Sequence, residues 1–204
     1  MSQDLELLLR EIRSCRHCVE TPRGKPLPHD PRPVFQVSAT ARICICGQAP
    51  GTRVHASGVP FTDPSGDRLR DWMGVTSEEF YDQSRVAIIP MGFCFPGLDA
   101  KGGDLPPRKE CADVWRARLF DKLPQFELVL LVGTYAQSWH MGAARKKSLT
   151  ETVKSWDVGS LMEEGTAFIP MPHPSWRNNV WLKKNPWFEE RILPALKDAV
   201  RARL

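Results

Sequence analysis

A histidine held between two prolines is the first feature of this chain that suggests chemistry. The stretch PMPHPSWRNN, residues 170–179, places His173 between Pro172 and Pro174 and continues with serine, tryptophan, arginine and two asparagines. Proline restricts the backbone, so the imidazole lies on a stiff segment among many side-chain hydrogen-bond donors. We call this segment the histidine loop. A neutral imidazole can donate a hydrogen bond to an oxygen that gains negative charge.

Six cysteines form a second set of residues with chemical potential. Disulfides are rare in cytosolic proteins, so thiols in such a chain indicate metal binding or redox chemistry. Cys15 and Cys18 form a C-x2-C pair near the N-terminus. Cys44 and Cys46 alternate with isoleucines in the run RICIC, and we expect both to be small, buried residues of a strand.

A glycine-rich segment, GQAPGTRVHASGVPF at residues 47–61, follows that run, and we call it the glycine loop. It lacks the Gly-Lys-Ser/Thr ending of a phosphate-binding Walker loop, and it does not read G-x-G-x-x-G. The glycine loop therefore gives no support for a nucleotide-hydrolysing or dinucleotide-binding function.

Apolar runs and amphipathic stretches predict the elements that position these loops. Strands are predicted at residues 42–46, 86–91, 126–132 and 167–171. Helices are predicted at residues 3–14, 65–73 with Ser65 as the cap, 110–122 and 186–203, with others from a Thr76 capping box and from Tyr135. This alternation indicates a three-layer α/β/α fold with a central, mostly parallel four-stranded sheet. The loops at the carboxyl ends of such strands meet at one edge, where ligands bind.

The bulk properties are those of a globular protein. A length of 204 residues suits one domain, whose residues 1–33 form an arm that carries the C-x2-C pair. No apolar run is long enough to span a bilayer, and the N-terminus does not resemble a signal peptide, so we expect a cytoplasmic protein. We also expect a monomer that does not bind membranes. The net charge of +4 permits a nucleic-acid partner without requiring one.

Taken together, the two loops resemble motifs A and B of the uracil-DNA glycosylase superfamily. GQAPGTRVHASGVPF looks like motif A and HPSWR looks like motif B, in the family's order and spacing. The similarity is closest to the iron–sulfur-containing, thermophile-type branch, whose motif A has the form G-E-x-P-G…G-x-P-F. That branch holds a 4Fe-4S cluster through four cysteines, which correspond here to Cys15, Cys18, Cys94 and Cys111. Four thiolates suit such a cluster, although the ligand type alone also allows zinc.

The resemblance implies a DNA repair enzyme and assigns roles within both loops. Such an enzyme flips a damaged base out of the stack and breaks its bond to the sugar. The family pattern implies that His173 bonds a base carbonyl and that Phe61 stacks on the flipped base. It places further base-binding and DNA-contacting residues at Gly47, Ala49, Gly51, Ser175, Trp176 and Arg177.

This chain departs from the family pattern at the residues that activate the hydrolytic water and at the residue that hydrogen-bonds the edge of the base. The carboxylate that activates water in well-known members follows G-Q, where this chain has Ala49, and the related branch has Glu where this chain has Gln48. Gln48 cannot act as a base but can orient a water. Uracil-reading members often carry Asn at the position of Pro90. The replacement activators that the sequence offers are His55, Asp63 and Asp67.

Three functions are consistent with these patterns. The first is a monofunctional DNA glycosylase, a hydrolase acting on single- or double-stranded DNA that contains a deaminated base, uracil above all. The second is a non-catalytic binder of uracil-containing or abasic DNA. The third is an unrelated metalloprotein in which the four-cysteine site is itself the function.

Overall fold

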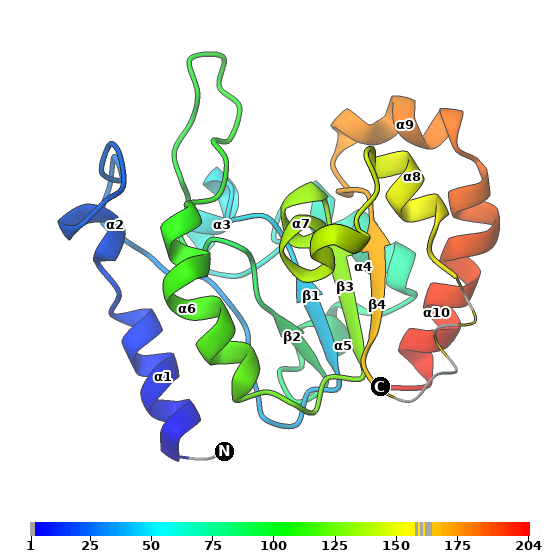
Figure 1. Cartoon of the computed structure of the whole chain (residues 1–204), viewed down its shortest axis with the longest axis horizontal. Coiled ribbons are helices and arrows are strands. Elements are labelled where there is room, and N and C mark those ends of the chain that lie inside the picture. The colour runs from blue at the N-terminus through cyan, green and yellow to red at the C-terminus, as the bar shows by residue number, and fades with distance from the viewer. Residues whose placement is uncertain (1–2, 158, 160, 162–164) are drawn as a thin grey trace.

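Four parallel strands form the centre of the structure, a computed structural model that describes residues 3–157, 159, 161 and 165–204. The strands lie in the order β2-β1-β3-β4, with bounds β1 (Ile43–Cys46), β2 (Val86–Ile88), β3 (Leu128–Val132) and β4 (Ala167–Met171). Helices flank both sides of the sheet in Figure 1, which confirms the predicted α/β/α fold. All carboxyl ends of the strands point to the upper edge of that view.

The second strand ends earlier than predicted. β2 stops at Ile88 because Pro90, shortly after it, has no N–H group to donate to the ladder. Backbone pairing resumes beyond the proline, where the next two residues donate to the carbonyls of Gly47 and Gln48 at 2.9 and 3.0 Å. These bonds hold the start of the glycine loop against the loop that follows β2.

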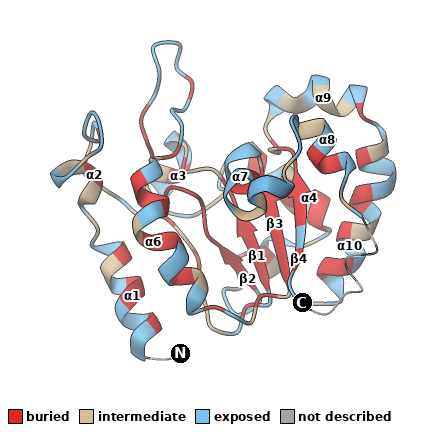
Figure 2. Ribbon diagram, viewed as in Figure 1, coloured by how far each residue is buried: buried red, intermediate tan, exposed pale blue. Residues whose placement is uncertain are grey.

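One face of the sheet packs against α1 (Gln3–Arg13), α6 (Lys109–Asp121) and α7 (Thr134–Met141). These helices match the predictions at residues 3–14, at 110–122 and from Tyr135. The apolar stripe of α1 is buried as its spacing requires: Leu5, Leu8, Leu9 and Ile12. Figure 2 shows the long helices buried on one side and exposed on the other.

The opposite face packs against α4 (Pro64–Met73) and α10 (Leu193–Arg201). A π-helical turn, Phe188–Ile192, leads into α10, and the two together match the predicted closing helix. Side chains of β1 alternate between the two layers, because successive residues of a strand point to opposite faces. Cys44 and Cys46 face the α1–α6 layer and are completely buried, which confirms that they are core residues.

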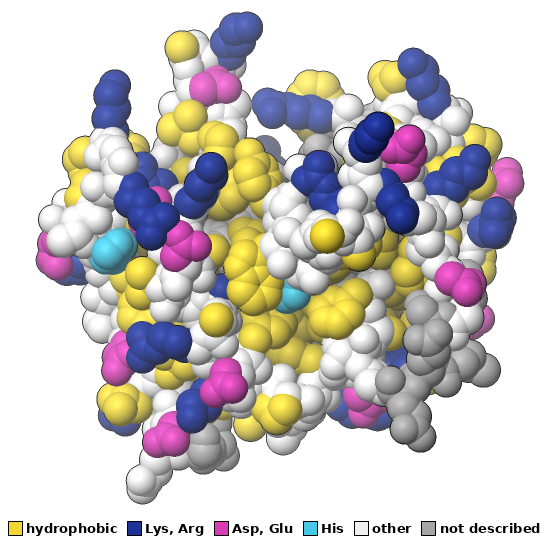
Figure 3. All heavy atoms as spheres, in the orientation of Figure 1, with side chains coloured by type: hydrophobic (Ala, Val, Ile, Leu, Met, Phe, Trp, Pro, Cys, Tyr) yellow, Lys and Arg dark blue, Asp and Glu magenta, His cyan; other side chains and the backbone are white. Residues whose placement is uncertain are grey.

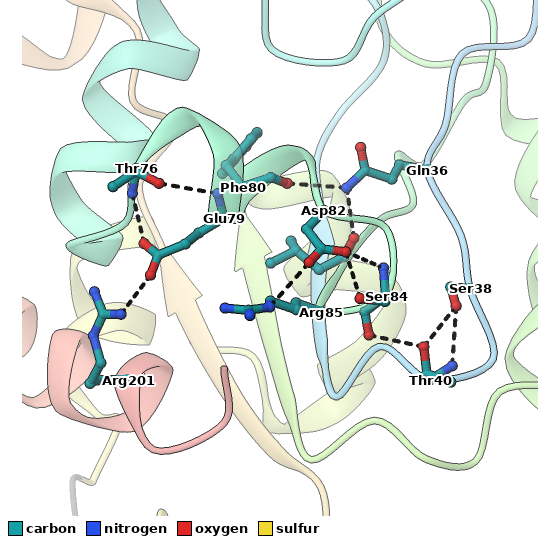
Figure 4. A network of polar contacts seen from close by, with 11 residues as sticks. Gln36, Ser38, Thr40, Thr76, Glu79, Phe80, Asp82, Ser84, Arg85 and Arg201 are labelled. Carbon is teal, nitrogen blue, oxygen red and sulfur yellow. Dashed lines mark hydrogen bonds and ion pairs between the residues drawn. The ribbon is translucent and has the colours of Figure 1, made fainter.

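A network of polar contacts closes the lower edge of the sheet (Figure 4). The predicted capping box is confirmed: Thr76 Oγ1 accepts from Glu79 N at 3.1 Å, and Glu79 Oε2 accepts from Thr76 N at 2.9 Å. It opens α5 (Ser77–Tyr81), and Arg201 of α10 donates to the other Glu79 oxygen at 2.7 Å. Gln36 pairs with β2 and so covers the outer edge of the sheet.

The start of α4 differs from the prediction that Ser65 is its cap. The helix begins at Pro64, and Asp63 occupies the cap position. Proline is favoured in the first turn because the N–H that it lacks has no partner there. The Asp63 side chain accepts no hydrogen bond from the helix start, and Ser65 is buried. Both residues are therefore free for another role.

Several short helices lie in segments for which no helix was predicted. They are α2 (His17–Glu20), α3 (Thr52–Ser57), α8 (Leu149–Lys154), α9 (Asn179–Lys184) and the 3-10 turns Gly142–Ala144 and Trp176–Asn178. Short helices gain most of their stability from tertiary packing, so the sequence pattern alone is a weak guide to them. None of the described helices has the length and apolarity needed to cross a bilayer.

Candidate active site

A cavity of about 80 Å³ lies beyond the carboxyl ends of β1 and β2. We call it the central cavity, and Phe61 and His173 both line it. The structure brings seven of the predicted site residues to its wall: Gly47, Gln48, Ala49, Gly51, Phe61, Asp63 and His173. The glycine loop and the histidine loop therefore share one hollow. Its volume leaves room for ordered water.

Phe61 lines this cavity in an unusual backbone conformation. Its φ is 54°, the only positive φ outside glycine among the described residues. The Tyr81 hydroxyl and Arg70 Nη1 donate to the Phe61 carbonyl at 3.1 and 3.4 Å, which holds the strained turn. A side chain at Gly66 would approach that carbonyl oxygen to 1.9 Å, so the turn requires glycine there. The Phe61 ring faces Gly47, where an added Cβ would lie 3.4 Å away.

The imidazole of His173 is oriented by its own loop. The backbone N–H of Ser175 donates to His173 Nδ1 at 3.2 Å, so Nδ1 is unprotonated and the neutral ring carries its proton on Nε2. The side-chain amide of Asn178 donates to the His173 carbonyl at 2.7 Å and anchors the backbone. The loop thus leaves an Nε2–H donor for a ligand in the central cavity.

Burial keeps this imidazole neutral. It lowers the pKa of His173 below the ordinary histidine value, and the carboxylate of Asp63 opposes the shift. The imidazole is therefore neutral near pH 7, as an uncharged donor requires. Polar side chains that line the cavity together with His173 are those of Asp63, Gln48, Ser65 and Asp104.

Two predicted water activators do not line the central cavity. The His55 ring lies against His29, with centroids 4.2 Å apart, and its pKa is lowered by burial and by the charges of His29 and Arg32. Asp67 is exposed and forms an ion pair with Arg70. Of the three candidates, only Asp63 is a wall residue of this cavity.

The predicted DNA-contacting residues lie at the start of the 3-10 turn that follows His173, with Ser175 as its cap. Trp176 is 73% exposed, and the Arg177 guanidinium lies 5.8 Å from the centroid of its ring. Arg68 of α4 donates to the Ser175 carbonyl at 3.2 Å and fixes the base of the turn. An exposed indole beside a guanidinium provides stacking and charge at one point of the surface.

A second cavity, of about 20 Å³, is lined by the four cysteines of the predicted metal site: Cys15, Cys18, Cys94 and Cys111. We call it the cysteine cavity. Trp115 Nε1 donates to Cys15 Sγ and Phe93 N donates to Cys111 Sγ, both at 3.3 Å. The cavity joins the N-terminal arm, the loop after β2 and the start of α6.

The cysteine thiols are not arranged as a compact single-ion site. Among the described residues, no three or more His, Cys, Asp or Glu side chains converge to hold one metal ion. Burial raises the pKa of Cys94 to about 12 and also raises that of Cys111. Both are therefore protonated near neutral pH without a metal, and ligation requires the loss of these protons.

Comparison with known families supports the resemblance seen in the two loops. Residues 34–197 match the uracil DNA glycosylase superfamily. The chain belongs to this superfamily. The matched region includes both loops and the second pair of cysteines, whereas Cys15 and Cys18 lie before it. For this superfamily member, the central cavity is the candidate active site.

Sequence reasoning missed several wall residues of the central cavity. Asp104 and the buried Ser65 contribute polar groups, and Ile88 and Val34 contribute apolar surface. Asp104 was hidden in a loop rich in glycine and proline, where its position after β2 was the only signal. Ser65 had been assigned to the helix cap.

Proposed function

We propose that this member of the uracil DNA glycosylase superfamily is a monofunctional DNA glycosylase of base-excision repair. It takes a deaminated base, uracil above all, out of the DNA stack and hydrolyses its N-glycosidic bond. The observation that carries the proposal is the convergence of Phe61 and His173 on one cavity. Water is the nucleophile in this scheme, so the product is an intact abasic site.

His173 stabilises the departing base. Cleavage of the N-glycosidic bond develops positive charge on the sugar and negative charge on the base. The Nε2–H of His173 donates to a base carbonyl oxygen as that charge grows, and no proton transfer is needed. The hydrogen bond from Ser175 N to His173 Nδ1 fixes the required tautomer before the substrate binds. The imidazole therefore does not have to change its orientation or tautomer as the transition state forms.

Phe61 and the glycine loop hold the extruded base. The Phe61 ring offers a planar face for stacking, and Gly47 below it leaves the space that a side chain would fill. Gln48 can bond the base or orient a water through its amide, which Ala49 cannot. Pro90 lines the cavity without a side-chain amide, so hypoxanthine and xanthine belong in the substrate panel with uracil.

DNA binds across the carboxyl edge of the sheet in this proposal. Lys and Arg side chains gather in the upper half of the molecule in Figure 3, on the side of the strand ends. Ser175 and its neighbouring amides contact phosphates, while Trp176 or Arg177 fills the gap that the extruded nucleotide leaves. The 73% exposure of Trp176 suits such a wedge.

The donor set of the cysteine cavity supports a 4Fe-4S cluster of the kind found in the thermophile-type branch. Its four thiols are soft donors suited to iron–sulfur ligation. A four-iron cube spreads its thiolates farther apart than one ion does. The shared cavity and the lack of a compact single-ion group among the described residues therefore do not conflict. The cluster would serve to attach the N-terminal arm to α6.

An oligonucleotide panel tests the activity. Purified protein is incubated with single- and double-stranded DNA containing uracil, hypoxanthine or xanthine, and abasic sites are then cleaved with alkali. We expect strand scission above a boiled control, with uracil as the first substrate. His173→Ala should slow single-turnover cleavage by about 10²- to 10³-fold, the usual effect of removing one oxyanion donor, while DNA affinity changes little.

Asn178→Ala is a useful companion to this variant. It removes the anchor of the His173 carbonyl and leaves the imidazole in place, so its loss of rate should be smaller. No scission on any substrate, together with tight and salt-sensitive binding of uracil-containing or abasic DNA, would instead support a non-catalytic binder. Ala49, Gln48 and Pro90 are the residues that favour this second function.

A further inference from the structure

The glycine loop leaves a gap in the wall of the central cavity. Ala49 stands where well-known superfamily members carry the carboxylate that activates water, and Gly51, two positions later, has no side chain. Asp104 enters this gap from a different element, the loop between β2 and α6. Its Oδ2 lies 3.2 Å from the place where a Cβ of Gly51 would stand. A side chain at position 51 would therefore crowd the carboxylate.

The backbone around Asp104 is well defined. Residues 97–105 form a small hairpin in which Leu98 and Asp104 pair as antiparallel neighbours. Leu105 N donates to the Gly97 carbonyl at 2.9 Å, and Asp99 N donates to the Gly103 carbonyl at 2.7 Å. The Asp99 carboxylate closes the turn by accepting from Gly103 N and Lys101 N. Asp104 is thus presented to the cavity by a constrained segment, the tall loop near the top of Figure 1.

Charged groups on three elements act on Asp104. Burial raises the pKa of its carboxyl group, Arg177 of the histidine loop lowers it, and Asp63 and Asp99 raise it. The result is a carboxyl group with a raised pKa that lines the same cavity as Phe61 and His173. A carboxylate that is more basic than an ordinary aspartate and borders the reaction cavity has the properties of a general base.

We propose that Asp104 is the catalytic base that activates the hydrolytic water, in place of the carboxylate that Ala49 lacks. This inference rests on the proposed function. The water oxygen forms a bond to C1′ of the sugar as the C1′–N bond breaks, and the bonding electron pair leaves with the base. The proton of the water passes to Asp104, while His173 Nε2–H stabilises the anionic base, which then takes a proton from solvent.

The decisive variant is Asp104→Asn, which keeps the size of the side chain and removes its basicity. We expect single-turnover base release at pH 7.5 to fall by about 10²- to 10⁴-fold, the range typical of general-base catalysis. Affinity for uracil-containing DNA should stay the same or increase, because a negative charge beside DNA is lost. Asparagine has nearly the same shape as aspartate, and Asp104 lies outside the hydrophobic core, so a thermal melt should show an intact fold.

The pH profile separates a base from a merely structural residue. In the wild type, base release should fall as the pH drops through the raised pKa of Asp104, where the carboxylate becomes protonated. Asp104→Asn should lose this limb and give a residual rate that is flat over the same range. A structural role would lower the rate at every pH and leave the limb in place, and that result would overturn the assignment.

Asp99→Asn is the matched control. It removes a carboxylate from the same hairpin, also acted on by Arg177, but its amide oxygen can still accept the two turn hydrogen bonds. Its rate at pH 7.5 should stay close to wild type and its acid limb should remain, moved to lower pH because Asp99 no longer raises the pKa of Asp104. Equal losses in both variants, or loss of the acid limb in Asp63→Asn rather than in Asp104→Asn, would refute the role of Asp104. A wild type that releases no base would instead refute the proposed function itself.

Discussion

At the scale of single residues, the site combines Phe61, whose backbone is strained, with His173, whose imidazole is oriented by its own loop. A non-glycine residue with positive φ costs on the order of 1–3 kcal/mol and persists only where its surroundings enforce it. At Phe61 the enforcement comes from Tyr81, Arg70 and the absence of a side chain at Gly66. Such strain is concentrated at functional sites, in agreement with the proposed stacking role of the Phe61 ring.

The lowered pKa of His173 leads to a prediction about stability. The imidazole has a lower pKa in the folded protein than in the unfolded chain, so the unfolded chain binds more protons between the two values. The stability that His173 contributes as a neutral imidazole is therefore fully present above about pH 6.5, the ordinary histidine pKa. It is lost as the pH falls from there toward the pKa of the folded protein. Between pH 8 and pH 5.5, urea denaturation should show a larger loss of unfolding free energy in wild type than in His173→Gln.

Comparing wild type with His173→Gln cancels the pH-dependent contributions of the other titratable groups to the free energy of unfolding. The pKa of His55 is also lowered, as are those of carboxylates such as Glu79 and Asp82. These groups are present in both proteins, so their effects are the same in each. Equal pH dependence in the two proteins would mean that His173 titrates alike in the folded and unfolded states.

At the scale of elements, α4 links the core to the site. Its far end packs Leu69, Trp72 and Met73 into the core, while its first turn presents Asp63 and Ser65 to the central cavity. The helix is fixed to the glycine loop by close contact between Gly66 and the Phe61 carbonyl. The position of α4 therefore determines the position of the Phe61 ring.

Gly66→Ala tests this coupling. Alanine has the higher helix propensity by about 1 kcal/mol, so local preference alone predicts stabilisation. The clash with the Phe61 carbonyl oxygen predicts the opposite, a loss of about 1–3 kcal/mol in urea denaturation together with reduced base release. Gly24→Ala is the control, because an added Cβ there meets nothing within 4 Å and should change stability little. A stabilised Gly66→Ala would contradict the strained turn.

At the scale of the whole molecule, the N-terminal arm is joined to the rest of the chain at the cysteine cavity. The cavity takes two of its thiols from the arm and two from residues beyond β2. Ion pairs between α1 and α6, such as Arg118 with Glu11, are exposed and contribute little. The buried apolar stripe of α1 holds the first part of the arm, and the proposed metal group would hold the segment around Cys15 and Cys18.

Cys18→Ala should therefore abolish the brown colour and visible absorbance expected of an iron–sulfur protein. Loss of the cluster should lower Tm by about 5 °C or more, since about 2 kcal/mol corresponds to such a shift in a chain of this size. Cys44→Ala is the control, because that buried thiol does not line the cysteine cavity and the absorbance should remain. A colourless wild type with bound zinc would favour the zinc alternative.

The elements and the two loops could be predicted from the sequence because local patterns determine them. Alternating Ile and Cys in β1, the Thr76–Glu79 capping box and the stripe of α1 each specify their element through neighbouring residues. The errors were local too: Pro90 ended β2 early, and Asp63 rather than Ser65 took the cap of α4.

Only the tertiary structure decided which side chains meet in the central cavity. His55, Asp63 and Asp67 are equally plausible activators in the sequence, yet only Asp63 lines it, and Asp104 joins from a loop that no pattern singled out. Local periodicity determines which face a residue takes within its own element. The meeting of residues from separate elements depends instead on how the strands are ordered and how the loops cross the strand ends, and this is a property of the packed chain.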